Sequence, residues 1–259
     1  TGRIMTEAGE EKDFITASTN AEGIARFADK IRYTGAGTYE YTIEEITELP
    51  GYTKPAPQKI TVVMSDDNKD GTLVPAVTYE SGEGYASFVN TYEARGSVKM
   101  SASKLFDDYA YPKGGFRFYI TDSEGGSYSE DDVRIITGAN GLAEWSRGFT
   151  EADLFEGDEY MPERDIAYYI YEIDESSKNP GVDYEGAKKY AKVTVTIRDL
   201  GDGNIEATKS VDYEGVAADN KQSWLDRLLG KDAPVEADAY FRNHVKRQGA
   251  FRFEAVKLL

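Results

Sequence analysis

Three polar residues, Lys104, Glu172 and Asn243, each end an alternating apolar run of the kind that forms a strand with one buried face. The lysine is the most unusual of them, because lysine is almost never fully buried without a partner. The three runs fall near the start, the middle and the end of one repeating unit. In a two-layer β-sandwich the first and last strands can lie side by side, so the three side chains can meet in the core.

An amine, a carboxylic acid and a carboxamide in such a core have the groups needed for a covalent cross-link. Burial disfavours charge, which lowers the pKa of a lysine and raises that of a glutamate, so the pair can exist as neutral amine and neutral acid. A neutral amine is a nucleophile. A protonated glutamate can donate a hydrogen bond to the carboxamide, polarise its carbonyl and then pass protons to the leaving ammonia. The product is an amide between Lys104 and Asn243.

Two other interpretations fit the same residue pattern. The lysine and the glutamate can form a buried ion pair in which the asparagine completes the hydrogen bonds. Alternatively, Lys104 can lie at the end of its strand and extend its amine into solvent. The residue pattern alone leaves the cross-link, the ion pair and the solvent-exposed amine open.

The strand that carries Lys104 recurs at the end of the sequence, which indicates a tandem repeat. The spacing from Asn90 to Lys104 is 14 positions (104 − 90), and that from Asn243 to Lys257 is also 14 (257 − 243). In the first copy the alternate residues are Val98, Met100, Ala102 and Lys104. Each has a counterpart 153 positions later (251 − 98 and 257 − 104), namely Phe251, Phe253, Ala255 and Lys257.

The repeat predicts three parts in an all-β protein built from tandem β-sandwich domains. Residues 1–94 form a domain that lacks its first strand, 97–247 form a complete domain, and 249–259 form the first strand of a third. The 25 glycines, the 19 tyrosines and the short alternating runs are typical of such a fold.

Within the first part, residues 21–27 read as a turn that leads into a strand, and residues 88–92 read as another strand. Their counterparts in the complete domain are residues 139–145 and the strand that carries Asn243. Glu45 and Asn90 then correspond to Glu172 and Asn243, so the first part repeats the acid and the carboxamide.

The complete domain also contains an insertion with the pattern of a short amphipathic helix. Asp219 or Asn220 provides the N-cap and Gly230 ends the helix. Between them an aromatic residue and three leucines recur at helical spacing, at Trp224, Leu225, Leu228 and Leu229. Such a face more often covers a sheet edge than binds a ligand.

Composition excludes several classes of function. The formal net charge of −17 repels a phosphate backbone, so nucleic acid is not expected as a partner. No apolar run approaches the length of a membrane span. The absence of cysteine and a single histidine, His244, leave no thiolate site, histidine-rich metal site or Ser/His/Asp triad, so no metal or cofactor is expected. Residues 66–71 imitate the start of a calcium loop, but Val77 replaces the glutamate at its twelfth position, which favours a hairpin turn.

Several segments of the sequence resemble those of a known family. The chain is similar to the isopeptide-linkage domains of streptococcal major pilins and, more distantly, to the B-repeats of collagen-binding adhesins. The phrases that carry the resemblance are Gly37-Thr38-Tyr39-Glu40-Tyr41-Thr42-Ile43-Glu44-Glu45, Asp70-Gly71-Thr72-Leu73 and Phe88-Val89-Asn90-Thr91-Tyr92. The likeness covers nearly the whole chain.

This resemblance implies an Ig-like β-sandwich with an intramolecular bond from lysine to asparagine, assisted by a buried acid. Carried over by position, Lys104 is the nucleophile, Glu172 the acid and base, and Asn243 the electrophile. Glu45 and Asn90 match in the first part, where the lysine strand is missing, and only Lys257 is present in the third.

The expected function is that of a structural stalk segment in a Gram-positive pilin or adhesin, extracellular and held to the cell wall by an anchor outside this chain. It is not an enzyme with turnover, because the reacting side chains are consumed. Its partners are the neighbouring domains of the same polypeptide and host surface molecules. The alternative is a ligand- or carbohydrate-binding module that uses the tyrosine-rich face or the insertion. Two further hypotheses are a sortase acceptor at Lys113 and a bond from Lys257 of one copy to Asn90 of another.

Overall fold

A computed structural model of the chain describes residues 3–106, 110–214, 236–246 and 249. Contacts divide the chain into a first unit, Thr1–Glu48 with Thr53–Thr91, and a second unit, Leu49–Tyr52 with Tyr92–Leu259. The helix predicted at 219–230 lies outside the described residues. So does the strand predicted at 249–259 apart from Gly249, and with it Lys257.

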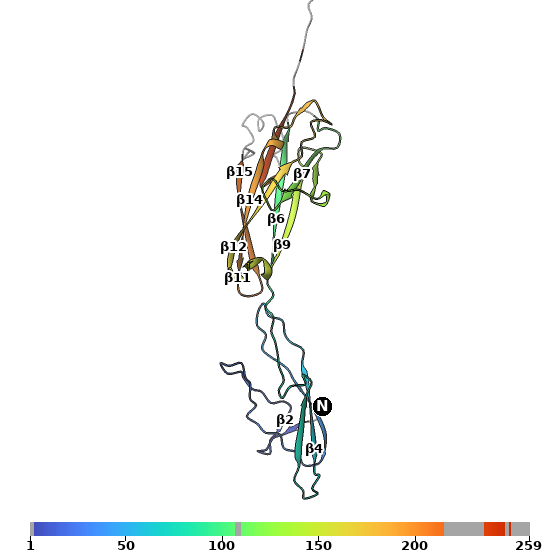
Figure 1. The fold of residues 1–259 in the computed structure, drawn as a ribbon, viewed down its shortest axis with the longest axis vertical. Helices are drawn as coiled ribbons and strands as arrows, with labels where there is room; N and C mark the ends of the chain where they lie inside the picture. The colour runs from blue at the N-terminus through green and yellow to red at the C-terminus, as the bar shows by residue number, and fades with distance from the viewer. Residues whose placement is uncertain (1–2, 107–109, 215–235, 247–248, 250–259) are drawn as a thin grey trace, which may run out of the picture. The chain divides into compact units, whose positions relative to one another are not determined.

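The second unit is a sandwich of two β-sheets (Figure 1). One sheet runs in spatial order β15 (Ile205–Glu214), β14 (Tyr190–Asp199), β12 (Glu163–Glu172), β7 (Phe116–Thr121) and β8 (Arg134–Ile136). The other runs β13 (Val182–Asp183), β16 (Ala239–Val245), β6 (Arg95–Phe106) and β9 (Leu142–Thr150). Neighbouring strands are antiparallel except β16 and β6, which are parallel. The predicted all-β class is confirmed.

One hydrophobic core fills the space between these two sheets. The residues that form this core follow the two-residue repeat of a strand. In β14 every second residue from Ala191 to Ile197 is buried, while the intervening residues are more exposed. From the other sheet, β6 contributes Met100 and Ala102 and β9 contributes Trp145, all of them nearly inaccessible to solvent. The alternating face of the lysine strand therefore points into the core, as its sequence predicts.

A carboxylate at the start of β16 fixes how this strand lies beside β6. Asp238 Oδ2 accepts hydrogen bonds from the backbone N–H of Ser101 at 2.8 Å and from its hydroxyl at 3.1 Å. The same oxygen accepts one from Lys209 Nζ of β15 at 2.7 Å. Ala239 then pairs with Ala102 and Phe241 with Lys104. A register slip of one residue would turn the core-facing side chains of β16 outward, so this contact matters for the whole strand.

We expect Asp238→Ala to weaken the attachment of β16. The change leaves the Ser101 N–H without its charged acceptor, which costs about 1–3 kcal/mol when the group is partly buried. Amide hydrogen exchange of β16 should become faster, while that of β12 should change little. Asp158→Ala, at an exposed turn, is the matched control. Equal exchange of β16 in the two variants would contradict the assignment.

The remaining elements of the second unit are short. β10 (Phe155–Glu156) and β11 (Glu159–Tyr160) form a small hairpin. Three 3₁₀ turns connect strands: η1 (Glu130–Asp132), η2 (Glu151–Leu154) and η3 (Gly186–Lys188). η2 begins with a capping box, in which the Asp153 carboxylate accepts from both the N–H and the hydroxyl of Thr150.

The first unit has two small sheets and a small core. β1 (Ile4–Met5) pairs with β2 (Glu11–Lys12), and β3 (Gly37–Ile43), β4 (Gln58–Ser65) and β5 (Val74–Tyr79) form the other sheet. The hairpin predicted at residues 66–71 is confirmed, because β4 and β5 are antiparallel and Asp66 accepts from the N–H groups of Asp70 and Gly71. The buried cluster consists of Ile60, Val62 and Met64.

Two strands predicted for the first unit do not form. Residues 21–27 make only an isolated bridge at Ala25. Of residues 88–92, the first four are irregular and Tyr92 makes only an isolated bridge. Their counterparts in the second unit are β9 and β16, which lie on either side of β6. The described part of the first unit holds no counterpart of β6, so neither segment has the neighbour with which it would pair.

Candidate functional site

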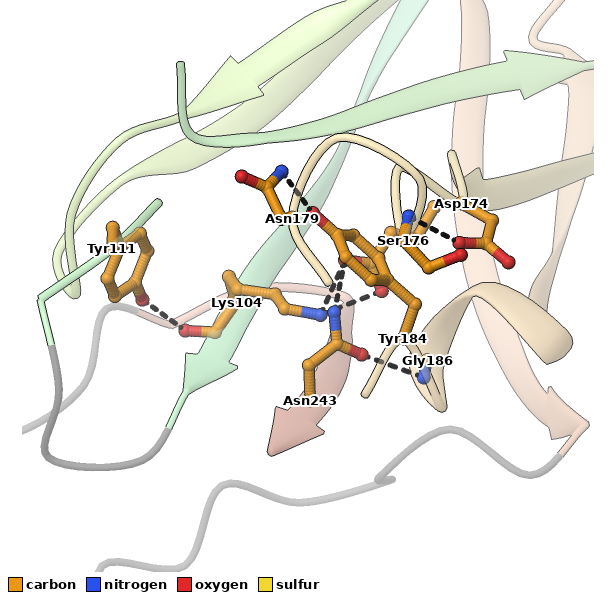
Figure 2. Close-up of polar contacts among 9 residues, drawn as sticks. Lys104, Tyr111, Asp174, Ser176, Asn179, Tyr184, Gly186 and Asn243 are labelled. Carbon is orange, nitrogen blue, oxygen red and sulfur yellow. Dashed lines mark hydrogen bonds and ion pairs between the residues drawn. The ribbon is translucent and has the colours of Figure 1, made fainter. Parts of the chain in front are cut away.

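Lys104, Glu172 and Asn243 come together inside the second unit. Lys104 Nζ lies 2.7 Å from both carboxylate oxygens of Glu172. Asn243 Nδ2 donates to Glu172 Oε1, also at 2.7 Å. Figure 2 shows the ends of the Lys104 and Asn243 side chains close to each other. One oxygen atom, Oε1, therefore contacts both the amine and the carboxamide nitrogen.

The strands place each side chain by their ordinary alternation. Lys104 follows Ala102 on the core face of β6, and Glu172 follows Ile170 on the core face of β12 in the opposite sheet. Because β16 and β6 are parallel with Phe241 opposite Lys104, Asn243 is two residues further along the same face. The amine and the carboxamide thus come from neighbouring strands, and the acid comes from across the sandwich.

Aromatic rings enclose the three polar groups. Lys104 Nζ lies 4.6 Å from the ring centroid of Phe116 and 5.9 Å from that of Phe118. The Phe118 ring packs in turn on Phe241, with the centroids 5.3 Å apart. The exposed fractions are 1% for Lys104 and 0% for Asn243, so the cluster is closed to bulk water. This excludes the interpretation in which the lysine extends into solvent.

Burial shifts both ionisable groups toward their neutral forms. Desolvation lowers the pKa of Lys104 to about 8, against the attraction of the Glu172 carboxylate, which raises it. Desolvation also raises the pKa of Glu172, with the charge and hydrogen bonds of Lys104 and the hydrogen bond from Asn243 acting in the opposite direction. Both shifts favour a neutral amine beside a protonated acid over the ion pair.

One further residue contacts the site and was not predicted from the sequence. The backbone N–H of Gly186, at the start of η3, donates to Asn243 Oδ1 at 2.8 Å. A Cβ atom at this position would overlap Glu172 Oε2 and would lie 2.9 Å from Asn243 Oδ1. Gly186 is one of 25 glycines, and no motif around it distinguishes it from an ordinary turn glycine.

The first unit repeats part of this arrangement. Asn90 Nδ2 donates to Glu45 Oε1 at 3.1 Å, and both side chains are half-buried. In both units the asparagine amide nitrogen donates to the glutamate carboxylate. Lys257, predicted as the lysine of a third domain, lies outside the described residues.

Two other residues singled out in the sequence have ordinary positions. His244 is half-buried in β16, where it pairs with Asp183 of β13. Lys113 is exposed in the turn before β7. Within the described ranges, no group of three or more histidine, cysteine, aspartate or glutamate side chains could hold a metal ion.

Comparison with protein families agrees with this geometry. The family model FctA, described as a Spy0128-like isopeptide containing domain, matches residues 3–93 and 98–245. The chain belongs to this family. Both units therefore match this pilin-type domain family, and membership places the protein outside the cell, at its surface. A search of the curated proteins found no match. In the part of the chain that the structure describes, no helix is long and apolar enough to cross a membrane.

The electrostatics of this isopeptide-domain site predict a pH dependence. Asn243→Ala keeps the lysine and glutamate but removes the carboxamide. Because the folded pKa of Lys104, about 8, lies below the ordinary lysine value of 10.5, the unfolded chain binds a proton that the folded chain lacks between these values. The stability of Asn243→Ala should therefore rise from pH 8 to pH 10.5, by up to about 3 kcal/mol.

Denaturant unfolding at several pH values measures this rise. The control is Lys104→Met in the same Asn243→Ala background, which replaces the amine with an apolar side chain of similar length. Tyrosines that titrate at alkaline pH affect both proteins alike, so the difference between them isolates the lysine. Identical pH profiles would show that the Lys104 pKa is not lowered.

Proposed function

We propose that the second unit forms an intramolecular isopeptide bond between Lys104 and Asn243, with Glu172 as the acid and base, and that the chain is a stalk segment of a Gram-positive pilin or adhesin. The observation that carries the proposal is the position of Glu172 Oε1, 2.7 Å from Lys104 Nζ and 2.7 Å from Asn243 Nδ2. A single oxygen is thus within proton-transfer range of both the attacking and the leaving nitrogen.

The reaction exchanges one nitrogen for another at the asparagine carbonyl. The neutral amine of Lys104 attacks Asn243 Cγ with its lone pair, and the carbonyl π electrons move to Oδ1. The acid proton of Glu172 passes to Nδ2, and the attacking Nζ gives a proton back to the carboxylate. The bond from Cγ to Nδ2 then breaks, ammonia leaves and the carbonyl reforms. Glu172 ends as it began, but the two other side chains are consumed, so the chain acts once and is not an enzyme with turnover.

Burial supports this reaction over a permanent ion pair. Each partner would be a full charge in a dry, aromatic-walled site, where desolvation is expensive. The lowered pKa of Lys104 and the raised pKa of Glu172 supply the nucleophile and the acid together. The amide product carries no charge, so forming it removes the cost of burying one.

The strand order supports a mechanical role for the bond. Tension applied to the ends of the second unit enters through β6 and leaves through β16, which are parallel neighbours and would slide past each other. A covalent link from Lys104 to Asn243 carries this tension directly and bypasses the 138 residues between them (242 − 104). By the loop-entropy relation used for disulfides, closing such a loop also stabilises the fold by about 5 kcal/mol.

The same roles extend to the other parts of the chain. In the first unit Glu45 is the corresponding acid and Asn90 the corresponding electrophile. Lys257 is the nucleophile of a following domain. The same pairing between copies, Lys257 with Asn90, is the intermolecular form of this chemistry.

The binding-module alternative stays a prediction. Tyr119 stacks on Tyr128 and on Tyr171, with ring centroids 4.2 and 5.1 Å apart. The Tyr171 hydroxyl accepts from the Gly125 N–H, and the Tyr190 hydroxyl donates to Glu124. These four tyrosines therefore contact one another or other residues of the protein. Their presence on the tyrosine-rich face does not favour carbohydrate binding.

Intact mass tests the bond. The parent chain should be lighter than its sequence mass by one ammonia, because the amine, the acid and the carboxamide come together in the second unit. Glu172→Ala, which removes the proton carrier, should have the full mass. Glu163→Ala, an exposed glutamate at the other end of β12, is the control and should show the parent deficit. A digest should yield one fragment that joins the peptides of Lys104 and Asn243. A parent of full mass would refute the proposed function.

Single-molecule stretching tests the mechanical role. When the parent is pulled by its ends, the residues between Lys104 and Asn243 should stay shielded and add no length. In Glu172→Ala the same unit should unfold at lower force and release the loop, adding roughly 490 Å at about 3.5 Å per residue. Equal added lengths in a parent of reduced mass and in the variant would show that the bond does not carry the load.

A further inference from the structure

The two ends of the Asn243 carboxamide have different partners. Its Nδ2 donates to Glu172, and its Oδ1 accepts from the Gly186 N–H at 2.8 Å (Figure 2). A backbone N–H can only donate, so the carboxamide oxygen must be the atom that faces Gly186. The reverse orientation would set two donors against each other. This fixes the carbonyl oxygen away from Glu172 and toward the backbone.

We propose that the backbone N–H of Gly186 is the oxyanion donor of the isopeptide reaction, an inference that rests on the proposed function. When Lys104 Nζ attacks Cγ, the π electrons of the carbonyl move to Oδ1, which becomes negative. The donor already lies within the 2.7–3.1 Å range in which such groups stabilise the developing charge. Glu172 then transfers protons between the two nitrogens, and the Gly186 N–H stabilises the negative charge on Oδ1.

The N–H of Gly186 is available because the turn bonds of η3 begin one residue later. Ala187 N–H donates to the Tyr184 carbonyl, and Lys188 N–H to the Glu185 carbonyl, whereas that of Gly186 is directed at Asn243. A side chain at this position would overlap Glu172 Oε2. Only glycine lets the backbone approach both reacting partners without displacing one of them.

The surrounding contacts hold this donor in place before the reaction. β13, three residues upstream of Gly186, pairs with β16 through Val182 opposite Val245. Tyr184 is buried, with its ring 5.7 Å from that of Phe116 and its hydroxyl accepting from Asn179 Nδ2. The donor is thus attached to the strand that carries its acceptor, which is the preorganisation that oxyanion stabilisation requires.

An ester substitution tests the donor without adding a side chain. The whole chain is made by cell-free translation with glycolic acid in place of Gly186, which replaces the N–H by an oxygen atom and leaves the rest of the residue intact. Loss of ammonia is followed by intact mass and by the joined Lys104–Asn243 fragment. Lactic acid in place of Ala187 is the matched control, because it removes the next N–H of the same turn, which does not contact Asn243.

The control ester should lose ammonia at the parent rate, and the Gly186 ester should be slower by about 100-fold or more. Equal rates for the two esters would overturn the inference while leaving the proposed function intact. A parent that loses no ammonia would refute the proposed function itself. Fluorescence of the buried Trp145 reports whether each ester folds.

A second measurement covers the case in which the Gly186 ester does not fold. In Glu172→Gln, which cannot carry the proton, Asn243 remains unreacted. Hydrogen exchange of the Gly186 amide should be slow in this protein and faster when Asn243→Ala is added. Gly181 lies in the same connection, and its amide serves as the internal reference. A Gly186 amide that exchanges equally fast with and without Asn243 would also overturn the inference.

Discussion

The contact of Lys104 with Glu172 across the sandwich is the interaction on which the second unit depends. It joins the two sheets, together with the hydrogen bond from Asn243 to the same carboxylate, at a point lined by the aromatic rings of Phe116 and Phe118. Neither group could remain there alone, because an unpaired charge in a dry core costs several kcal/mol. The same burial that makes the pair expensive makes its members reactive, since it moves both toward their neutral forms. Stability and reactivity here have one cause.

A second constraint is the position of β6 in the middle of its sheet. This strand pairs with β9 on one side and with β16 on the other, although β16 is the last described strand of the unit. Such a parallel pair cannot be closed by a short turn, so the whole domain lies between its two members. The first unit shows the reverse case: in its described part, where no counterpart of β6 is present, the matching segments are irregular.

Sequence reasoning located the three polar side chains because strand alternation is a local property. Val98, Met100 and Ala102 define a face, and Lys104 continues it whatever the rest of the chain does. The strands expected at 21–27 and 88–92 failed for the opposite reason, because a strand also needs a neighbour. Gly186 could not be found at all, since its role arises from the approach of a turn to two side chains that are distant in sequence. The helix expected at 219–230 lies outside the described residues.

The register of β16 decides whether the proposed cross-link can form. Asn243 faces Lys104 only when this strand, the last described strand of the unit, docks with Ala239 opposite Ala102. A shift by one residue would direct the carboxamide to the other face of the sheet, where it could not react. During synthesis, 138 residues are added between Lys104 and Asn243 (242 − 104). The proposed amide would therefore form only in a domain whose β16 is in register with β6, so its presence would report completed folding.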